Sequence, residues 1–187
     1  SYKSVVDVFD KTGNEIFKTN LVTSRVADVS ISQDSKYLAI AEIDLSGILI
    51  KSSIQVVSIE LAKTNPSQAI INKYEAPTDK MILNVEYQEQ NKLICMYSDE
   101  IEVYEEKTST ELIKFDDKKE SFMTIELSNR VALVDEISTG EYTANTNIRI
   151  IDPNTKKERE YVTGSIAKSI KTSDNKMAIN FGTELHL

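Results

Sequence analysis

Hydrophobic and polar residues alternate along most of the chain, in short runs that end at turn residues. One five-residue pattern occurs four times, with apolar residues at positions one, three and four and polar residues at positions two and five. Successive copies begin 48, 47 and 47 residues apart. A spacing this constant indicates an internal repeat. The copies are Val6–Asp10, Ile54–Ser58, Ile101–Glu105 and Ile148–Asp152.

Further alternating segments flank each copy. A turn and another strand follow it, as in Lys11–Asn14 and Glu15–Thr19, where Gly and Asn are placed for a tight reversal. A hairpin precedes it, as in Val26–Ser32, the turn Gln33–Lys36, and Tyr37–Asp44. Four short strands in about 47 residues are typical of a blade of a β-propeller, in which each sheet packs against its neighbours.

These patterns predict an all-β fold with at least fifteen short antiparallel strands and almost no helix. Ile, Val and Thr make up 50 of the 187 residues, and β-branched residues favour sheet over helix. With strands lettered a to d from axis to rim, the chain is expected to begin with strands c and d and to end with a, b and the start of c. One β-propeller domain, 1–187, would then hold about three complete four-stranded blades and two half blades. Its blade parts are 1–20, 26–76, 81–116, 122–163 and 166–187.

One hairpin carries a family resemblance. Val29–Ala41 resembles the S-x-D-x-K-x-L-A hairpin between the first two strands of WD40-like and related bacterial propeller repeats, and Ser173–Ile179 is a fainter copy. The usual Pro and Gly are Gln33 and Ser35 here, and the sequence lacks the Gly-His and Trp-Asp pairs of WD40 repeats. The chain is therefore similar to a divergent WD40-like propeller. Val6 to about Asp116 is also similar to an uncharacterised family of bacterial, membrane-anchored, propeller-like proteins, which implies no catalytic residues.

Apolar positions on the inner strands are predicted to be buried between blades, because neighbouring blades cover both faces of those strands. They are Ile31, Leu38, Ile40, Val56, Val85, Ile94, Val103, Ile125, Leu133 and Ile150.

The repeat pattern stops inside a strand at Glu184–Leu187. A ring of six to eight blades needs roughly 250 to 380 residues at this period, so we expect the chain to be part of a longer protein. The alternative is a four-bladed ring, closed by pairing the first c and d strands with the last a and b strands. Open blade edges would otherwise favour completion by other residues or self-association.

Charge and cysteine content exclude several classes of partner and site. The chain has 22 basic and 30 acidic residues, a net charge of −8, so we expect neither nucleic-acid binding nor direct membrane contact. No apolar run is long enough to span a membrane, and the first residues do not resemble a signal peptide. The single cysteine, Cys95, cannot form an intramolecular disulfide and lies in an apolar run, so it is expected to be buried.

Candidate catalytic residues are sparse. The one histidine, His186, is the second-last residue, so any Ser-His-Asp or Cys-His site would depend on an incomplete strand. The five glycines are too far apart for a phosphate-binding loop. Asp116–Glu120 lacks the spacing of a calcium loop, and the adjacent Asp135 and Glu136 should face opposite sides of a strand. We therefore predict no catalytic, cofactor-binding or metal-binding residues and no enzyme activity.

The connections between strands b and c are long at 44–53 and 138–147, but only two residues, Asp99–Glu100, in the blade between them. All b–c connections leave one face of a propeller, so the long ones should flank a low spot on that face. Loops on a rigid scaffold often bind partners. The alternative, equally open, is that both merely extend the hairpins. The c–d connection Glu60–Gln68 should hold a helical turn and be structural. Candidate partner-binding residues are Ile48, Leu49, Ile50 and Tyr142.

Two functions fit these observations. The first is a non-catalytic protein-interaction or scaffolding propeller, the extracytoplasmic part of a bacterial protein anchored by a segment outside this chain. The second is an enzyme or small-ligand-binding propeller whose site is completed by residues outside this chain. The first needs no special residues and is the hypothesis that the sequence favours.

Overall fold

The computed structural model describes residues 4–88, 91–105, 108–115, 123–126, 130–138, 144–173, 176–182 and 185–186. They form five antiparallel sheets that follow one another in chain order. Sheet 1 is β1 (Ser4–Phe9) and β2 (Glu15–Leu21). Sheet 2 is β3 (Ser24–Ile31), β4 (Tyr37–Asp44), β5 (Lys51–Ser58) and β6 (Ile70–Glu75). Sheet 3 is β7 (Ile82–Tyr87), β8 (Leu93–Tyr97), β9 (Glu100–Glu105) and β10 (Thr108–Lys114). Sheet 4 is β11 (Met123–Glu126), β12 (Val131–Ser138), β13 (Ala144–Ile151) and β14 (Glu158–Val162), and sheet 5 is β15 (Ser169–Ser173), β16 (Lys176–Asn180) and β17 (Leu185–His186).

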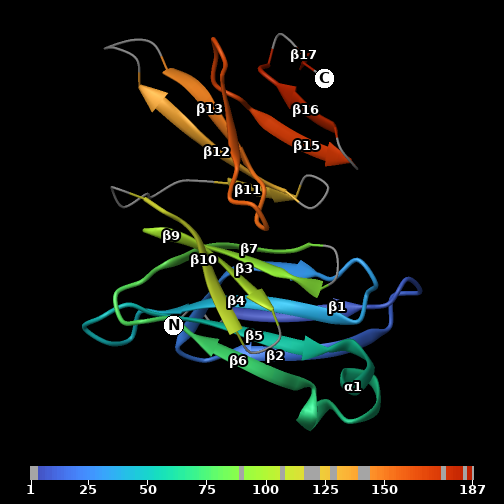
Figure 1. The fold of residues 1–187 in the computed structure, drawn as a ribbon. Helices are drawn as coiled ribbons and strands as arrows, with labels where there is room; N and C mark the ends of the chain where they lie inside the picture. Colours follow the sequence, from blue (N-terminus) through green and yellow to red (C-terminus); the bar gives the residue numbers. More distant parts are fainter. Residues whose placement is uncertain are drawn as a thin grey trace.

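The sheets are arranged as a partial propeller. Figure 1 shows sheet 2 in the lower part of the molecule, sheet 3 above it, and sheets 4 and 5 side by side at the top. The first strands of successive sheets, β3, β7, β11 and β15, contact one another, so they form the inner side of the arc. The predicted fold class and strand count are confirmed. The helical turn predicted in the connection 60–68 is also present, as α1 (Ile59–Thr64) and the 3₁₀ turn η1 (Pro66–Gln68).

The repeat positions are structurally equivalent. Ile54, Ile101 and Ile148 each lie on the third strand of a sheet, and each is paired with a buried residue of the second strand. All three are buried in the core that their sheet shares with the following sheet. The repeat read from the sequence is therefore a repeat of the fold.

Four hydrophobic cores lie between successive sheets. The second strand of a sheet supplies both adjacent cores, because its side chains alternate between the two faces. In β8, Leu93, Cys95 and Tyr97 pack toward sheet 2, whereas Ile94 and Met96 pack toward sheet 4. Cys95 is buried as expected, and burial raises the pKa of its thiol.

Side chains also join neighbouring sheets. Asp28 Oδ2 on β3 accepts a hydrogen bond from the backbone N–H of Val85 at 3.0 Å. Ser30 Oγ, two residues further on, accepts one from the N–H of Tyr87 at 2.9 Å. The inner edge of β7 thus finds side-chain acceptors on the preceding sheet, which satisfies backbone donors that a propeller strand otherwise leaves unpaired.

Most of the predicted core is confirmed, with one error. Ile31 is 52% exposed. Sheet 1 consists of two strands, which pack against the outer part of sheet 2 and leave this end of β3 uncovered. The equivalent residue of sheet 3, Tyr87, is buried against sheet 2. Ile150 is partly buried, and the side chain of Ile125 lies outside the described residues. The confirmed residues are Leu38, Ile40, Val56, Val85, Ile94, Val103 and Leu133.

The residue at the fifth repeat position stabilises the turn that follows the third strand. Asp10 Oδ1 accepts hydrogen bonds from the backbone N–H groups of Thr12 and Asn14 at 2.8 and 2.9 Å. Asp152 Oδ1 likewise accepts hydrogen bonds from two backbone N–H groups of its turn, those of Asn154 and Thr155, at 2.9 and 3.0 Å. Hydrogen bonds stabilise the carboxylate form and so lower the pKa of both aspartates. The main causes are the side chains of Thr12 and Asn14 for Asp10, and the backbone N–H groups of Thr155 and Asn154 for Asp152. At the same position in sheet 2, Ser58 caps α1.

We expect Leu38→Ala to lower the free energy of unfolding by about 2 to 5 kcal/mol, because it empties a fully packed site. Ile31→Ala, at the cross-strand partner of Leu38, should cost less than about 1 kcal/mol because half of that side chain is in water. Urea unfolding followed by circular dichroism measures both. Equal costs for the two variants would contradict this burial pattern.

We expect stability to fall at acid pH through Asp10 and Asp152. Their pKa values are lower in the folded chain than the ordinary 3.8, so the unfolded state binds protons first. The stabilisation is complete above that value and declines as the pH falls toward the folded pKa values. The urea midpoint of the wild type should therefore drop more between about pH 5 and about pH 2.5 than that of the Asp10→Asn/Asp152→Asn variant. Parallel declines would show that these turns are not responsible.

We expect Ser35→Gly to raise the free energy of unfolding by about 0.5 to 1 kcal/mol. Ser35 has a φ of +57°, a left-handed conformation that costs less for glycine, and related repeats have Gly here. Ser46→Gly is the matched control, since Ser46 does not have a positive φ and should lose stability through added chain entropy. A midpoint that falls in Ser35→Gly would contradict the expectation.

Candidate functional site

The connection between β4 and β5 places apolar side chains in solvent. It spans residues 45–50, shorter than the expected 44–53, because β4 continues to Asp44 and β5 begins at Lys51. Ile48 is 102% exposed, and Leu45 and Leu49 are about half exposed, at 52% and 47%. Ile50 is partly buried. Two of the predicted contact residues are therefore at the surface, and Ile50 belongs to the base of the connection.

Both ends of this connection are held in place. Asp44 Oδ1 accepts a hydrogen bond from the Ser46 N–H at 2.8 Å, and Asp44 Oδ2 accepts one from the Thr23 hydroxyl at 3.3 Å. Hydrogen bonding to Ser46 is the main cause that lowers the pKa of Asp44. At the other end, the carbonyl of Ile50 accepts a bond from the Asp79 N–H at 3.0 Å. The connection is thus tied to the β2–β3 and β6–β7 connections on either side.

A fourth exposed apolar residue lies in the connection whose Thr23 hydroxyl contacts Asp44. Val22, which precedes Thr23 in the β2–β3 connection, is 73% exposed. We call Val22, Leu45, Ile48 and Leu49 the aliphatic patch. Because the base of the β4–β5 connection is anchored, the patch is presented on fixed elements.

The second long hairpin is described only in part. Tyr142 lies outside the described residues, as do 139–143. β12 and β13 remain paired up to Ser138 and Ala144, so much of the span 138–147 extends the hairpin, as one alternative expected. The short connection in sheet 3 is Ser98–Asp99, because Glu100 already belongs to β9. Figure 1 shows the β4–β5 connection and the paired ends of β12 and β13 on the same side of the molecule.

An ionic cluster lies between these hairpins, in sheet 3. The ammonium group of Lys80 contacts the carboxylate of Glu100 and lies 2.9 Å from Oε1 of Glu102. It also lies 4.8 Å from the centroid of the Tyr97 ring. All three charged side chains are largely buried. The ammonium group of Lys80 therefore joins the β6–β7 connection to two carboxylates of β9, so the cluster is suited to holding these elements together.

Tyrosines continue this cluster toward sheet 2. The hydroxyls of Tyr97 and Tyr104 are 2.9 Å apart, and burial is the main cause that raises the pKa of both. The rings of Tyr104 and Tyr74, from sheets 3 and 2, have centroids 4.5 Å apart. Sequence analysis missed this network. The feature of the sequence that could have indicated the network is the alternation of Glu100 and Glu102 with buried apolar residues.

The other complete sheets carry polar contacts at equivalent positions. In sheet 2, the buried Glu42 accepts hydrogen bonds from the side chains of Ser53 and Gln55 at 2.7 and 2.9 Å. In sheet 4, the amide of Asn147 donates to Glu160 at 2.7 Å. Each cluster lies near the connection between the second and third strands. Their repetition indicates an architectural role.

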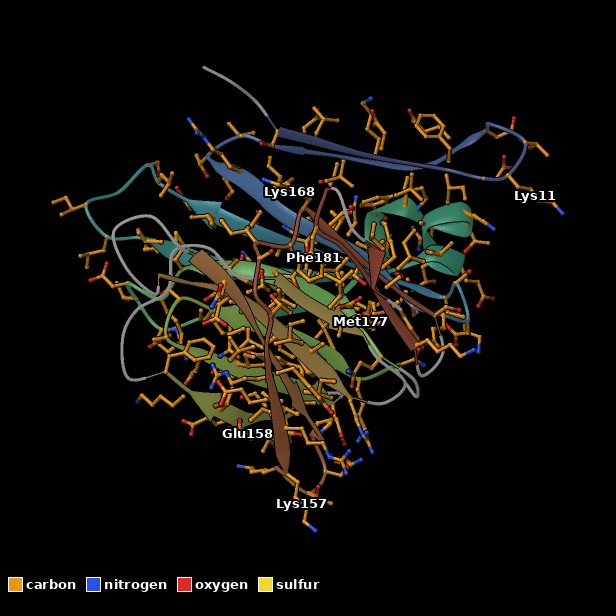
Figure 2. All side chains as sticks on the ribbon, turned by 90° about the horizontal axis from the view of Figure 1, so that it is seen from above. Lys11, Lys157, Glu158, Lys168, Met177 and Phe181 are labelled. Carbon is orange, nitrogen blue, oxygen red and sulfur yellow. The ribbon has the colours of Figure 1, made fainter. Side chains whose placement is uncertain are left out.

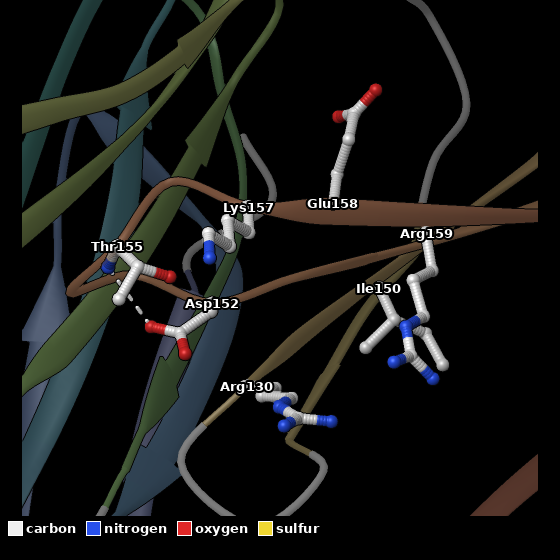
Figure 3. Close-up of a pocket in the computed structure, with 7 residues that line it drawn as sticks. All are labelled: Arg130, Ile150, Asp152, Thr155, Lys157, Glu158 and Arg159. Carbon is white, nitrogen blue, oxygen red and sulfur yellow. Dashed lines mark hydrogen bonds between the residues drawn. The ribbon is translucent and has the colours of Figure 1, made fainter.

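A cavity of about 320 Å³ lies on sheet 4 (Figure 3). Arg130 and Arg159 extend into the same space, whereas Glu158 points away. The carboxylate of Asp152 is taken up by its own turn. The cavity is lined by Arg130, Ile150, Asp152, Thr155, Lys157, Glu158 and Arg159.

Most of the residues weighed for catalysis have side chains outside the described part of the chain. Asp116–Glu120 and the side chains of Glu136 and His186 lie outside it. Among the described residues, no group of His, Cys, Asp and Glu has an arrangement that would bind a metal ion. In the same ranges, no helix has the length and apolar composition to cross a membrane.

Comparison with solved structures supports the propeller fold. The β-propeller domain of the Trilobed protease from Pyrococcus furiosus superposes with a TM-score of 0.60 and 14% sequence identity. The match covers 97% of this chain and 62% of that chain, so this chain spans less than two thirds of the solved domain. A search of curated proteins finds no match. The sequence matches, over residues 1–187, the model of a family of unknown function, DUF5711, and the chain belongs to that family.

Proposed function

We propose that this chain is a non-catalytic protein-interaction module that binds a partner protein through the aliphatic patch. The observation that carries the proposal is the full exposure of Ile48 at the tip of an anchored connection. Exposed apolar side chains are hydrated unfavourably, so a partner that covers them removes apolar surface from water and lowers the free energy. A firmly held loop also loses little conformational entropy on binding.

The scaffold supports this role. Cores between the sheets hold the strands rigidly, while the second-to-third-strand connections differ in length from sheet to sheet. Such variation at the ends of a constant framework is typical of binding surfaces. The charged side chains of Lys80, Glu100 and Glu102 are largely buried and contact one another, so this cluster offers little charge to a partner.

Net charge supports a neutral or basic partner. The chain carries a charge of −8, which disfavours nucleic acid and anionic membrane surfaces and favours encounter with positive surfaces. Added salt should therefore slow association more than it shortens the lifetime of the complex. The resemblance to bacterial, membrane-anchored, propeller-like proteins supports an extracytoplasmic location, with an anchor outside residues 1–187.

We expect Ile48→Ser/Leu49→Ser to weaken binding of the partner at least about tenfold, because it removes the apolar anchors and leaves the strands untouched. The partner is identified by affinity capture from an extract of the source organism, and its affinity for purified variants is measured by biolayer interferometry. Replacing residues 45–50 with a two-residue connection should abolish binding while the circular dichroism spectrum is retained.

The matched control is Ile70→Ser/Ile71→Ser on the rim strand β6, where both side chains are about half exposed. This control should bind like the wild type. Binding that survives the change at residues 48 and 49, or that is lost equally in the control, contradicts the aliphatic patch as the site.

A further inference from the structure

The β6–β7 connection, residues 76–81, contacts the base of the β4–β5 connection. Figure 1 shows the two connections on the same side of the molecule. The Asp79 N–H donates a hydrogen bond to the carbonyl of Ile50 at 3.0 Å. Directly after the connection, the Ile82 N–H donates one to the buried Ser52 Oγ at 3.0 Å. Two hydrogen bonds therefore join this segment to the residues that end the β4–β5 connection and begin β5.

Sheet 3 holds the same connection from its other side. The ammonium group of Lys80 contacts the carboxylates of Glu100 and Glu102 on β9. One residue further on, the carbonyl of Met81 accepts a hydrogen bond from the Ser98 N–H at 2.8 Å. The connection is thus a bridge, with the aliphatic patch of sheet 2 on one side and the ionic cluster of sheet 3 on the other.

Burial distinguishes Lys80 from a surface lysine. Lys11 and Lys157 extend outward at the edges of the molecule (Figure 2), whereas only 10% of the Lys80 side chain is exposed. The side chains of Glu100 and Glu102 are 9% and 14% exposed. Removing one partner of a buried ion pair is costly, because the remaining charge stays out of water. Without the ammonium group, two carboxylates on one face of β9 would repel each other.

The turn between these two sets of contacts depends on them for its conformation. The Lys80 N–H donates a hydrogen bond to the carbonyl of Pro77 at 3.3 Å, which closes a turn of residues 77–80. Asp79, the third residue of this turn, has a φ of +67°. That left-handed conformation is most favourable for glycine and costs free energy for aspartate. Contacts on both sides of the turn must therefore stabilise it.

We propose that Lys80 is a positioning residue for the aliphatic patch. Its ion pairs with β9 hold the turn 77–80 in place, and the turn presents the Asp79 N–H to the carbonyl of Ile50. The exposed residues of the β4–β5 connection directly precede Ile50, so the ionic cluster of sheet 3 fixes how sheet 2 presents them. The importance of this contact for partner binding rests on the proposed function, whereas its effect on the connection does not.

The two ends of the β4–β5 connection should respond differently to loss of the Lys80 ammonium group. At the first end, Asp44 accepts hydrogen bonds from Thr23 and Ser46, which belong to sheet 2 and its neighbouring connection. Those contacts do not involve sheet 3. Loss of the ion pairs should therefore loosen the second half of the connection, around Leu49, and leave Asp44 in place.

Amide hydrogen exchange of the 187-residue chain, resolved by NMR, tests this proposal without a partner. We expect Lys80→Met to speed exchange of the Asp79 N–H at least about tenfold, because the turn opens locally. The backbone order parameter at Leu49 should fall from about 0.8 to below about 0.6. The amides of β4 and β12, which report opening of the cores, should change much less. Lys80→Arg keeps the charge and should restore most of the protection at Asp79.

Lys92→Met is the matched control. Lys92 also contacts a carboxylate in sheet 3, that of Glu105 at 2.8 Å, but it precedes β8, whereas the ionic cluster lies near the connection that follows β8. This control should leave exchange of the Asp79 N–H unchanged.

A milder variant, Glu102→Gln, keeps the contact of Lys80 with Glu100 and serves if Lys80→Met does not fold. It should speed exchange of the Asp79 N–H about threefold. Three results overturn the proposal: unchanged exchange at Asp79 in both variants, equal acceleration in Lys92→Met, or equal acceleration throughout β4 and β12. The expected exchange, together with binding that survives the change at residues 48 and 49, would support the positioning role and contradict the proposed function alone.

Discussion

Every complete sheet of this protein has two apolar faces, and that property makes the sheets depend on one another. The second strands β4, β8 and β12 send alternate side chains into two different cores. A sheet removed from its neighbours would expose both sets of side chains to water. The free energy that holds the fold together therefore resides in the contacts between sheets, as in other repeat proteins whose units are stabilised by nearest neighbours.

Contacts between neighbouring sheets and connections also satisfy the polar groups of the interior. Asp28 and Ser30 accept hydrogen bonds from the backbone of the next sheet, and Lys80 is held by two glutamates beside the ring of Tyr97. Breaking such a contact leaves a buried donor or charge unpaired, which is costly. These contacts add geometric specificity to apolar packing, because they are satisfied only when neighbouring sheets meet in one register.

Because the cores between the sheets hold the strands in place, the connections between strands can differ in length without disrupting the fold. The connection between second and third strands is two residues in sheet 3 and six in sheet 2, and the longer one carries exposed aliphatic side chains on an anchored base.

The period of the sequence determined the fold class, the grouping of strands and the equivalence of Ile54, Ile101 and Ile148. It could do so because alternation and turn residues are local properties of the chain. The exposure of Ile48 and Leu49 was predictable for the same reason, since they lie in a connection. Only the tertiary structure decided that Ile31 is exposed and its equivalent Tyr87 is buried, because burial depends on which strands the neighbouring sheet supplies. Likewise, the contact of Lys80 with Glu100 and Glu102 forms because the β6–β7 connection packs against β9. The spacing of these residues along the sequence does not predict it.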